Sequence, residues 1–168
     1  MSEFDRTKGA FLLLSLLVVV TDQWSKWLVE RSLPLHQPME IIPGFLNFTH
    51  VQNSGVAFGM FAANGSSRGT LILTALGLVA LVVVGVYFWH TSSHDRLMLT
   101  SLALILGGAV GNLMDRIAAG SVTDFIDAYV STYHWHTFNV ADSAITIGIC
   151  LMAVEIFRAG RKPSASTD

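Results

Sequence analysis

Residues 69–89 read GTLILTALGLVALVVVGVYFW, an apolar run without a charged side chain. A helix needs about 20 mostly apolar residues to cross the hydrocarbon core of a bilayer, so this run is long enough to span one. Three other apolar runs have a similar length, and we place further spans at about 9–30, 97–116 and 139–157. The sequence therefore predicts an all-α membrane protein with four transmembrane helices.

The composition agrees with a membrane protein. Hydrophobic residues make up 52% of the 168 residues and charged residues only 13%, against roughly 25% charged in soluble domains. The mean hydropathy is +0.54. The net charge of −2 gives no electrostatic support for binding nucleic acid. The single cysteine, Cys150, cannot form an internal disulfide, and we expect it to be a small buried apolar residue.

The spans leave one long connection between the first and the second helix. Prolines and a Pro-Gly pair break helices there, and the pattern at 45–51 indicates a short strand. We predict a small β-rich extracytoplasmic cap at about 34–62. The whole chain, 1–168, is then a single integral membrane domain with a disordered polar tail at about 160–168.

Four spans place both termini on one side of the membrane, and the lysine and arginine distribution indicates which side. Six cations lie in the tails and the connection between the second and third spans, whereas two flank the long connection. They are Arg6, Lys8, Arg96, Arg158, Arg161 and Lys162 on the first side, and Arg31 and Arg68 on the second. We therefore expect cytoplasmic termini, with the cap and the 117–138 connection at the outer face.

Ionisable residues inside spans need partners, because each costs roughly 2.5–3.5 kcal/mol at the centre of a membrane helix. Asp22 and Lys26 are four residues apart on one helix face and can pair. The pair is either a structural salt bridge or the floor of a site. Asn112 and Arg116 also share a face, at the outer end of the third span, where they could form a donor cluster at a cleft.

Two carboxylates approach the outer surface from different segments. Asp124 lies in the 117–138 connection, and Asp142 lies about one turn, roughly 5 Å, inside the fourth helix. Two adjacent, partly desolvated carboxylates titrate as a pair, and such a pair can activate water against an amide carbonyl. From the residues alone, a solvated loop acid and a helix N-terminal acid are the simpler interpretation.

Other chemistries stay open on the residues alone. Ser143 follows an aspartate, but neighbours on a helix point apart, which disfavours a serine protease. His134 and His136 could hold a metal with Asp124 or Asp127, although the chain has no HExxH motif. A small transporter or proton relay is the main alternative, and a scaffold is a third. Against a relay, the acids gather at one face.

Five sequence blocks, in their order and spacing, resemble those of the bacterial lipoprotein signal peptidases. This family is also called signal peptidase II or prolipoprotein signal peptidase, and its members are intramembrane aspartyl peptidases. The blocks are DQWSK at 22–26, NSGVAF at 53–58, GGAVGNLMDR at 107–116, VTDF at 122–125 and FNVADSAI at 138–145. The resemblance covers about 9–158. Thr123 stands where the family commonly has an apolar residue, a change that we expect to be neutral.

The resemblance implies an aspartic endopeptidase of four helices and an outer β-cradle. Such an enzyme removes signal peptides from prolipoproteins by cutting before the diacylglyceryl-modified cysteine. The resemblance implies that Asp124 and Asp142 are catalytic and that no metal or other cofactor takes part. The same motifs imply further site residues, which bind substrate or orient the two aspartates, and they imply a structural polar pair. These are Asn53, Gly55, Asn112, Arg116 and Asn139, and the pair Asp22 and Lys26.

The resemblance further implies the partners and the location. The expected partners are prolipoproteins that carry diacylglyceryl-cysteine, membrane lipid and the inhibitor globomycin, with no nucleic acid. The protein is expected to act as a monomer. Its expected location is the bacterial cytoplasmic (inner) membrane, as a multi-pass protein with its active site at the outer face.

Overall fold

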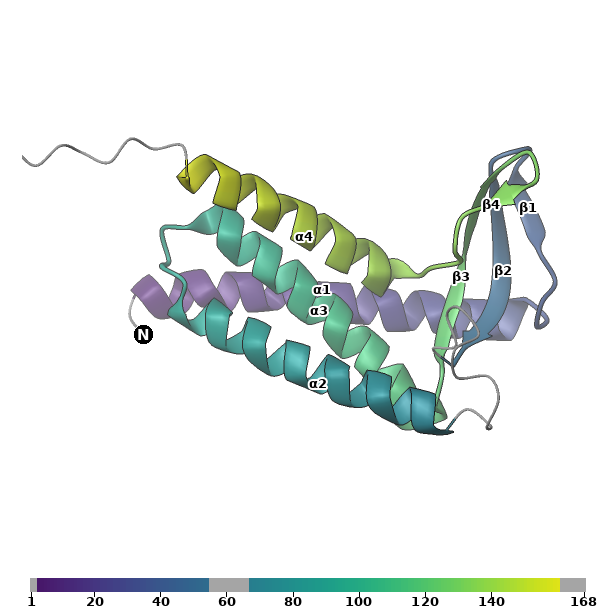
Figure 1. The fold of residues 1–168 in the computed structure, drawn as a ribbon, viewed down its shortest axis with the longest axis horizontal. Helices are drawn as coiled ribbons and strands as arrows, with labels where there is room; N and C mark the ends of the chain where they lie inside the picture. The colour runs from purple at the N-terminus through teal and green to yellow at the C-terminus, as the bar shows by residue number, and fades with distance from the viewer. Residues whose placement is uncertain (1–2, 55–66, 161–168) are drawn as a thin grey trace, which may run out of the picture.

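The computed structural model describes residues 3–54 and 67–160. Its helices are α1 (Glu3–Ser32), α2 (Ser67–His90), α3 (Arg96–Ala119) and α4 (Val140–Ala159). By length and hydropathy, four segments of the described chain can cross a membrane. They are Thr7–Ser32, Gly69–His90, Arg96–Ala119 and Val140–Arg158. The prediction of four transmembrane helices is therefore confirmed, and Figure 1 shows all four running lengthwise through the molecule.

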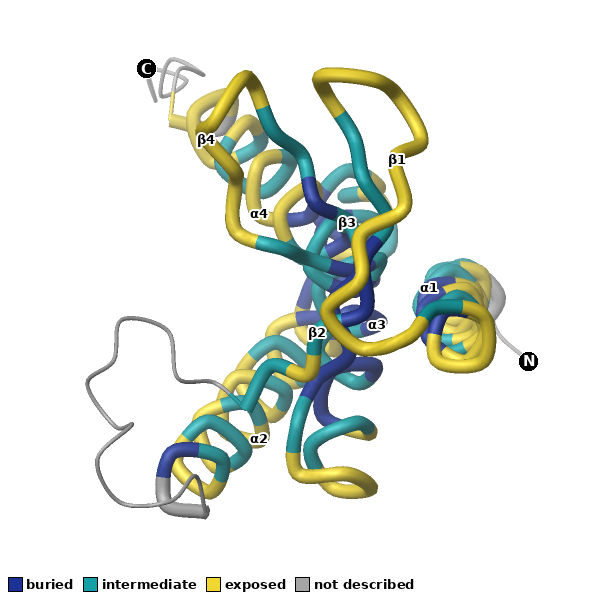
Figure 2. Tube along the Cα trace, turned by 90° about the vertical axis from the view of Figure 1, so that its right-hand side faces the viewer, coloured by how far each residue is buried: buried dark blue, intermediate teal, exposed yellow. Residues whose placement is uncertain are grey.

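Helix α3 lies at the centre of the bundle, because glycines let its neighbours approach closely. A Cβ atom built on Gly107 would lie 2.7 Å from the carbonyl oxygen of Ser15 in α1. On α4, a Cβ atom on Gly148 would lie 2.7 Å from the carbonyl oxygen of Ser101 in α3. Most of α2, by contrast, is exposed (Figure 2). Its outward apolar side chains suit contact with lipid.

Cys150 corrects one expectation from the sequence. It is exposed on α4 rather than buried. The reason is that α4 packs one face against α3 and leaves the other face open. On the outward face of a membrane-spanning helix, a small apolar side chain can contact acyl chains, so its apolar character does not require burial in protein.

A four-stranded antiparallel sheet crosses one end of the bundle (Figure 1). Its strands are β1 (Met39–Ile42), β2 (Leu46–Asn53), β3 (Val122–Val130) and β4 (Tyr133–His134), in that spatial order. The expected cap supplies β1 and β2. Strands β3 and β4 come from the 117–138 connection, in which the sequence indicated no strand.

The strand register places the sheet over the helix ends. Gln52 pairs with Thr123 and Val51 with Asp124, so β2 holds the segment of β3 that carries a candidate catalytic residue. The part of the expected cap at 55–62 lies outside the described residues. The expected disordered tail also lies outside them, apart from Gly160 at the end of α4.

Candidate active site

Asp124 sits on β3 in an almost water-free position, with 2% of its surface exposed. Its Oδ2 accepts a hydrogen bond from Asn53 Nδ2 at 2.8 Å, and its Oδ1 accepts one from Asn139 Nδ2 at 2.7 Å. Burial raises the pKa of Asp124 from 3.8 to about 6. The charge of Asp142 adds to this rise, and the two asparagine hydrogen bonds oppose it.

Asp142 sits in the first turn of α4 and forms a capping box with Asn139. Asn139 Oδ1 accepts from the Asp142 amide at 2.9 Å, and Asp142 Oδ2 accepts from the Asn139 amide at 3.3 Å. The other oxygen, Oδ1, accepts from Asn112 Nδ2 at 2.7 Å. Asn139 therefore contacts both carboxylates, Asp124 through its side-chain amide and Asp142 through its main chain.

Both carboxylates line one pocket of about 460 Å³. Asn53 and the segment that leads into α4 form one wall, and one face of α4 forms the other. The remaining lining residues are Trp135, His136, Thr137, Phe138, Ser143, Thr146 and Ile147. The pocket thus joins a polar end, where the two acids lie, to an apolar flank on a membrane-spanning helix.

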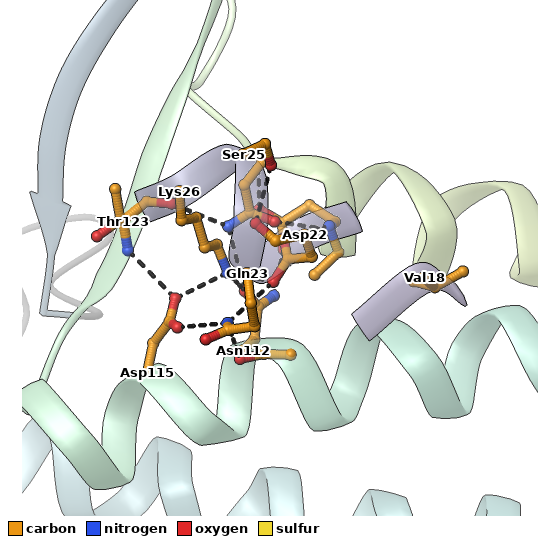
Figure 3. A network of polar contacts seen from close by, with 12 residues as sticks. Val18, Asp22, Gln23, Ser25, Lys26, Asn112, Asp115 and Thr123 are labelled. Atoms are coloured by element: carbon orange, nitrogen blue, oxygen red, sulfur yellow. Dashed lines mark hydrogen bonds and ion pairs between the residues drawn. The ribbon is translucent and has the colours of Figure 1, made fainter. Parts of the chain in front are cut away.

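A largely buried ion-pair network joins α1 to α3 beside the site (Figure 3). Lys26 Nζ lies 2.7 Å from Asp22 Oδ2, 2.7 Å from Asp115 Oδ2 and 3.1 Å from Asn112 Oδ1. The pair suggested by the helical spacing is therefore present, and Asp115 joins it from α3. Because Lys26 binds the oxygen of the Asn112 amide, the nitrogen of that amide faces Asp142.

Gln23 lies in the DQWSK motif, although it was not among the expected site residues. Its Nε2 donates to Asp115 Oδ1 at 2.7 Å and to the carbonyl oxygen of Gly111 at 3.2 Å (Figure 3). Asp115 is therefore held by a cation and an amide. The signal that could have found Gln23 is its place beside Asp22 in a helix that crosses a membrane, since an amide at this position also needs partners.

Arg116 is half-buried and turns back along its own helix. Its Nη1 donates to the carbonyl oxygen of Asn112 at 3.3 Å. It shares the α3 face of Asn112 as the spacing predicts, but it is not among the described residues that line the pocket. Gly55, another expected site residue, lies outside the described residues.

The histidines near the site have other partners. His134 Nδ1 lies 2.8 Å from Asp127 Oδ1, and the His134 ring stacks on Tyr129. His136 lines the pocket. Across residues 3–54 and 67–160, no three histidine, cysteine, aspartate or glutamate side chains gather as metal ligands would.

Comparisons with known proteins agree on one family. The family model described as signal peptidase (SPase) II matches residues 14–158. The lipoprotein signal peptidase of Solibacter usitatus is 43% identical over 146 residues, which cover 87% of this chain and 89% of the relative. That of Alteromonas mediterranea is 40% identical over 161 residues, which cover 96% and 87%. A bacterial membrane enzyme solved by the in meso method superposes with a TM-score of 0.74 at 32% identity, over 95% of each chain.

Proposed function

The chain belongs to the signal peptidase II family, and from that premise we propose that Asp124 and Asp142 are its catalytic pair. Family membership makes the chain a multi-pass membrane peptidase that removes signal peptides from prolipoproteins. The peptidase function is therefore favoured over the transporter, proton-relay and scaffold alternatives. The observation that carries the proposal is that both carboxylates, each held by neutral amides, face one pocket.

The hydrogen-bond donors suit a pair that exchanges a proton. Asn53 and Asn112 each donate an amide hydrogen to one carboxylate, at 2.8 Å and 2.7 Å. A neutral donor orients a carboxylate without a full salt bridge, so the carboxylate can still take up a proton. The cation Lys26 lies behind Asn112. The raised pKa of Asp124, about 6, brings its titration close to neutral pH, where proton transfer is efficient.

In the proposed reaction, a water molecule lies between the two acids. The ionised carboxylate accepts a proton from this water as its oxygen bonds to the carbonyl carbon of the scissile peptide. The protonated acid donates a hydrogen bond to the carbonyl oxygen, on which negative charge develops. When the tetrahedral intermediate collapses, the C–N bond breaks, and the carboxyl that took up the proton from water gives it to the leaving amine. The pair is then ready for another water molecule.

We further propose that the bond cut is the one before a diacylglyceryl-modified cysteine. The sheet crosses the ends of the spans, and the pocket is lined by Asp124 of β3 and by Asp142 in the first turn of α4, which supports a site at the depth of the membrane surface. A lipid anchor would hold the peptide at that depth. In this proposal the termini are cytoplasmic, the site opens at the outer face of the inner membrane, and the protein acts as a monomer. Globomycin would compete for the pocket. The substrate-binding roles of Arg116 and Gly55 rest on the motif match.

A gel-shift cleavage assay in detergent tests the catalytic pair. The substrate is a diacylglyceryl-modified prolipoprotein, and the same precursor without lipid runs in parallel. Asp124→Asn and Asp142→Asn should abolish cleavage, because an amide can neither accept nor deliver the proton. Asp127→Asn makes the same change on the same strand, at a carboxylate bonded to His134, and should retain cleavage.

The outcomes separate the parts of this proposal. Full activity in either dyad variant would refute the pair. Equal cleavage of the precursor without lipid would refute the lipid requirement. Loss of cleavage on adding a chelator would favour a metal site at His136, the histidine that lines the pocket. Each variant is checked for a wild-type elution profile in size-exclusion chromatography, so that a folding defect is not scored as a catalytic one.

A further inference from the structure

Thr123, the residue directly before Asp124, forms hydrogen bonds through both its side chain and its main chain. Its side chain is buried, with 3% of its surface exposed. Its Oγ1 donates to Glu30 Oε1 at 2.6 Å and accepts from Gln52 Nε2 at 3.2 Å. Glu30 lies near the end of α1 and Gln52 on β2. One hydroxyl therefore ties β3 to the first membrane helix and to the neighbouring strand.

The main chain of Thr123 is held as well. Its amide donates to Asp115 Oδ2 at 3.5 Å, and its carbonyl oxygen accepts from Asn139 Nδ2 at 3.4 Å. Both partners belong to the site, since Asp115 pairs with Lys26 and Asn139 contacts both acids. The position of Thr123 is thus set from α1, β2, α3 and the start of α4.

The geometry of a strand makes this position important for its neighbour. Successive side chains point to opposite faces, so the Thr123 hydroxyl holds β3 from the face opposite to Asp124. A small rotation of β3 about its own axis would then swing the Asp124 carboxylate within the pocket. Displacements of about 1 Å between reacting groups can cost roughly 100-fold in rate.

We propose that Glu30 and Thr123 are a positioning pair, which sets the orientation of Asp124 toward Asp142 by holding β3 against α1. The inference rests on the proposed catalytic role of Asp124. It revises the expectation that a threonine here is neutral. Thr123 and Glu30 are not catalytic residues in this account, because they act through the placement of Asp124.

The hydrogen bond between Thr123 and Glu30 can be removed by a single substitution. Thr123→Val keeps the shape of the side chain and removes the hydroxyl. Glu30 is exposed and lies two residues before the end of α1, so at the membrane interface its carboxylate can be hydrated once the hydrogen bond is gone. The fold should therefore lose little when the link is cut. The conservative variants Thr123→Ser and Glu30→Gln keep a hydroxyl donor and an oxygen acceptor, respectively, and should preserve the link.

The test measures kcat and KM on the lipidated prolipoprotein, together with Tm. Thr123→Val and Glu30→Ala should each lower kcat by about 10-fold or more with KM within about 2-fold, because orientation and not substrate binding is lost. The double variant should lose no more than the larger single loss, as expected for two residues that act through one contact. Thr123→Ser and Glu30→Gln should recover most of kcat.

Thr100→Val is the matched control. Its hydroxyl donates only along its own helix, to the carbonyl oxygen of Arg96 at 2.8 Å, so its loss should leave kcat unchanged. A wild-type kcat in Thr123→Val would overturn the inference. So would additive losses in the double variant, or failure of both conservative variants to rescue. Asp124→Asn is measured alongside. If Asp124→Asn is inactive while Thr123→Val is normal, only the positioning pair is refuted. If Asp124→Asn is active, the catalytic pair itself fails, and the inference with it.

Discussion

Asp124→Asn removes a carboxylate from a place where the fold opposes its charge, so this variant should be more stable than the wild type near pH 7.5. The pKa of Asp124 is about 6 in the folded chain and 3.8 in its ordinary state. The folded state therefore binds this proton more tightly than the unfolded state does. The stability that the group contributes falls as the pH rises from about 4 to 6 and stays low above 6. This pKa difference corresponds to roughly 3 kcal/mol.

Part of that gain is lost again through hydrogen bonding. The Asp124 carboxylate accepts from Asn53 and Asn139, one on each oxygen. An asparagine at this position can accept from one of them only, and the loss of the other bond costs about 1 to 1.5 kcal/mol. The net gain near pH 7.5 is then about 1 to 2 kcal/mol, or a few degrees in Tm. Near pH 4.5 the wild-type carboxyl is largely protonated, and the advantage of the variant disappears.

Thermal unfolding in detergent at the two pH values measures this effect through tryptophan fluorescence. Asp127→Asn is the control on the same strand, because its carboxylate accepts from Asn47 at 3.0 Å and contacts His134. That variant should lower Tm near pH 7.5. The reasoning is refuted if Asp124→Asn is less stable than the wild type near pH 7.5. It is also refuted if the difference in Tm is the same at both pH values.

Three further predictions concern packing, charge and orientation. Gly148→Ala should lose about 1–3 kcal/mol of stability, since its Cβ would lie 2.7 Å from a main-chain oxygen of α3. Gly77→Ala is the control, because nothing lies within 4 Å of its added Cβ, and it should be neutral or gain up to about 1 kcal/mol of stability. Equal Tm values for Gly148→Ala and Gly77→Ala would contradict the packing account. Lys26→Met leaves the carboxylates of Asp22 and Asp115 without their cation and should cost about 3–5 kcal/mol, seen as poor recovery of folded protein. A wild-type Tm would contradict the ion-pair account. Asn112→Ala removes a donor to the Asp142 carboxylate and should lower kcat about 10-fold or more while the chain still inserts in the membrane, so an unchanged kcat would show that this amide does not orient the acid.

The spans could be predicted because the signal is local. Crossing a membrane requires length and hydropathy within one stretch of chain, and 69–89 shows both without reference to any other residue. Strands β3 and β4 could not be predicted in the same way. Most side chains along the first half of β3 are buried, including Thr123 and Asp124, so the alternation that usually marks a strand is absent. Its pairing with β2 joins segments far apart in the sequence.

In the site, too, contacts within one helix could be predicted from the sequence, whereas contacts between elements could not. Spacing within one helix was enough to suggest the contact between Asp22 and Lys26. The second partner, Asp115, depends on how α1 and α3 are rotated against each other, and close packing at glycines of α3 sets that rotation. Helical spacing also predicted that Arg116 shares a face with Asn112, but not that its side chain turns toward its own backbone. Contacts between elements therefore needed the folded chain.

The order of the strands along the chain has a consequence for biosynthesis. Strand β2 precedes α2, whereas β3 follows α3. During synthesis from the N-terminus, β3 can therefore join β2 only after α1, α2 and α3 have been made. A nascent chain at that stage carries Asp124 with Asn53 beside it, but it still lacks Asn139 and Asp142. The proposed catalytic pair forms only when the fourth helix arrives. On the proposed mechanism, the topology therefore delays proteolytic competence until the fourth helix is in place.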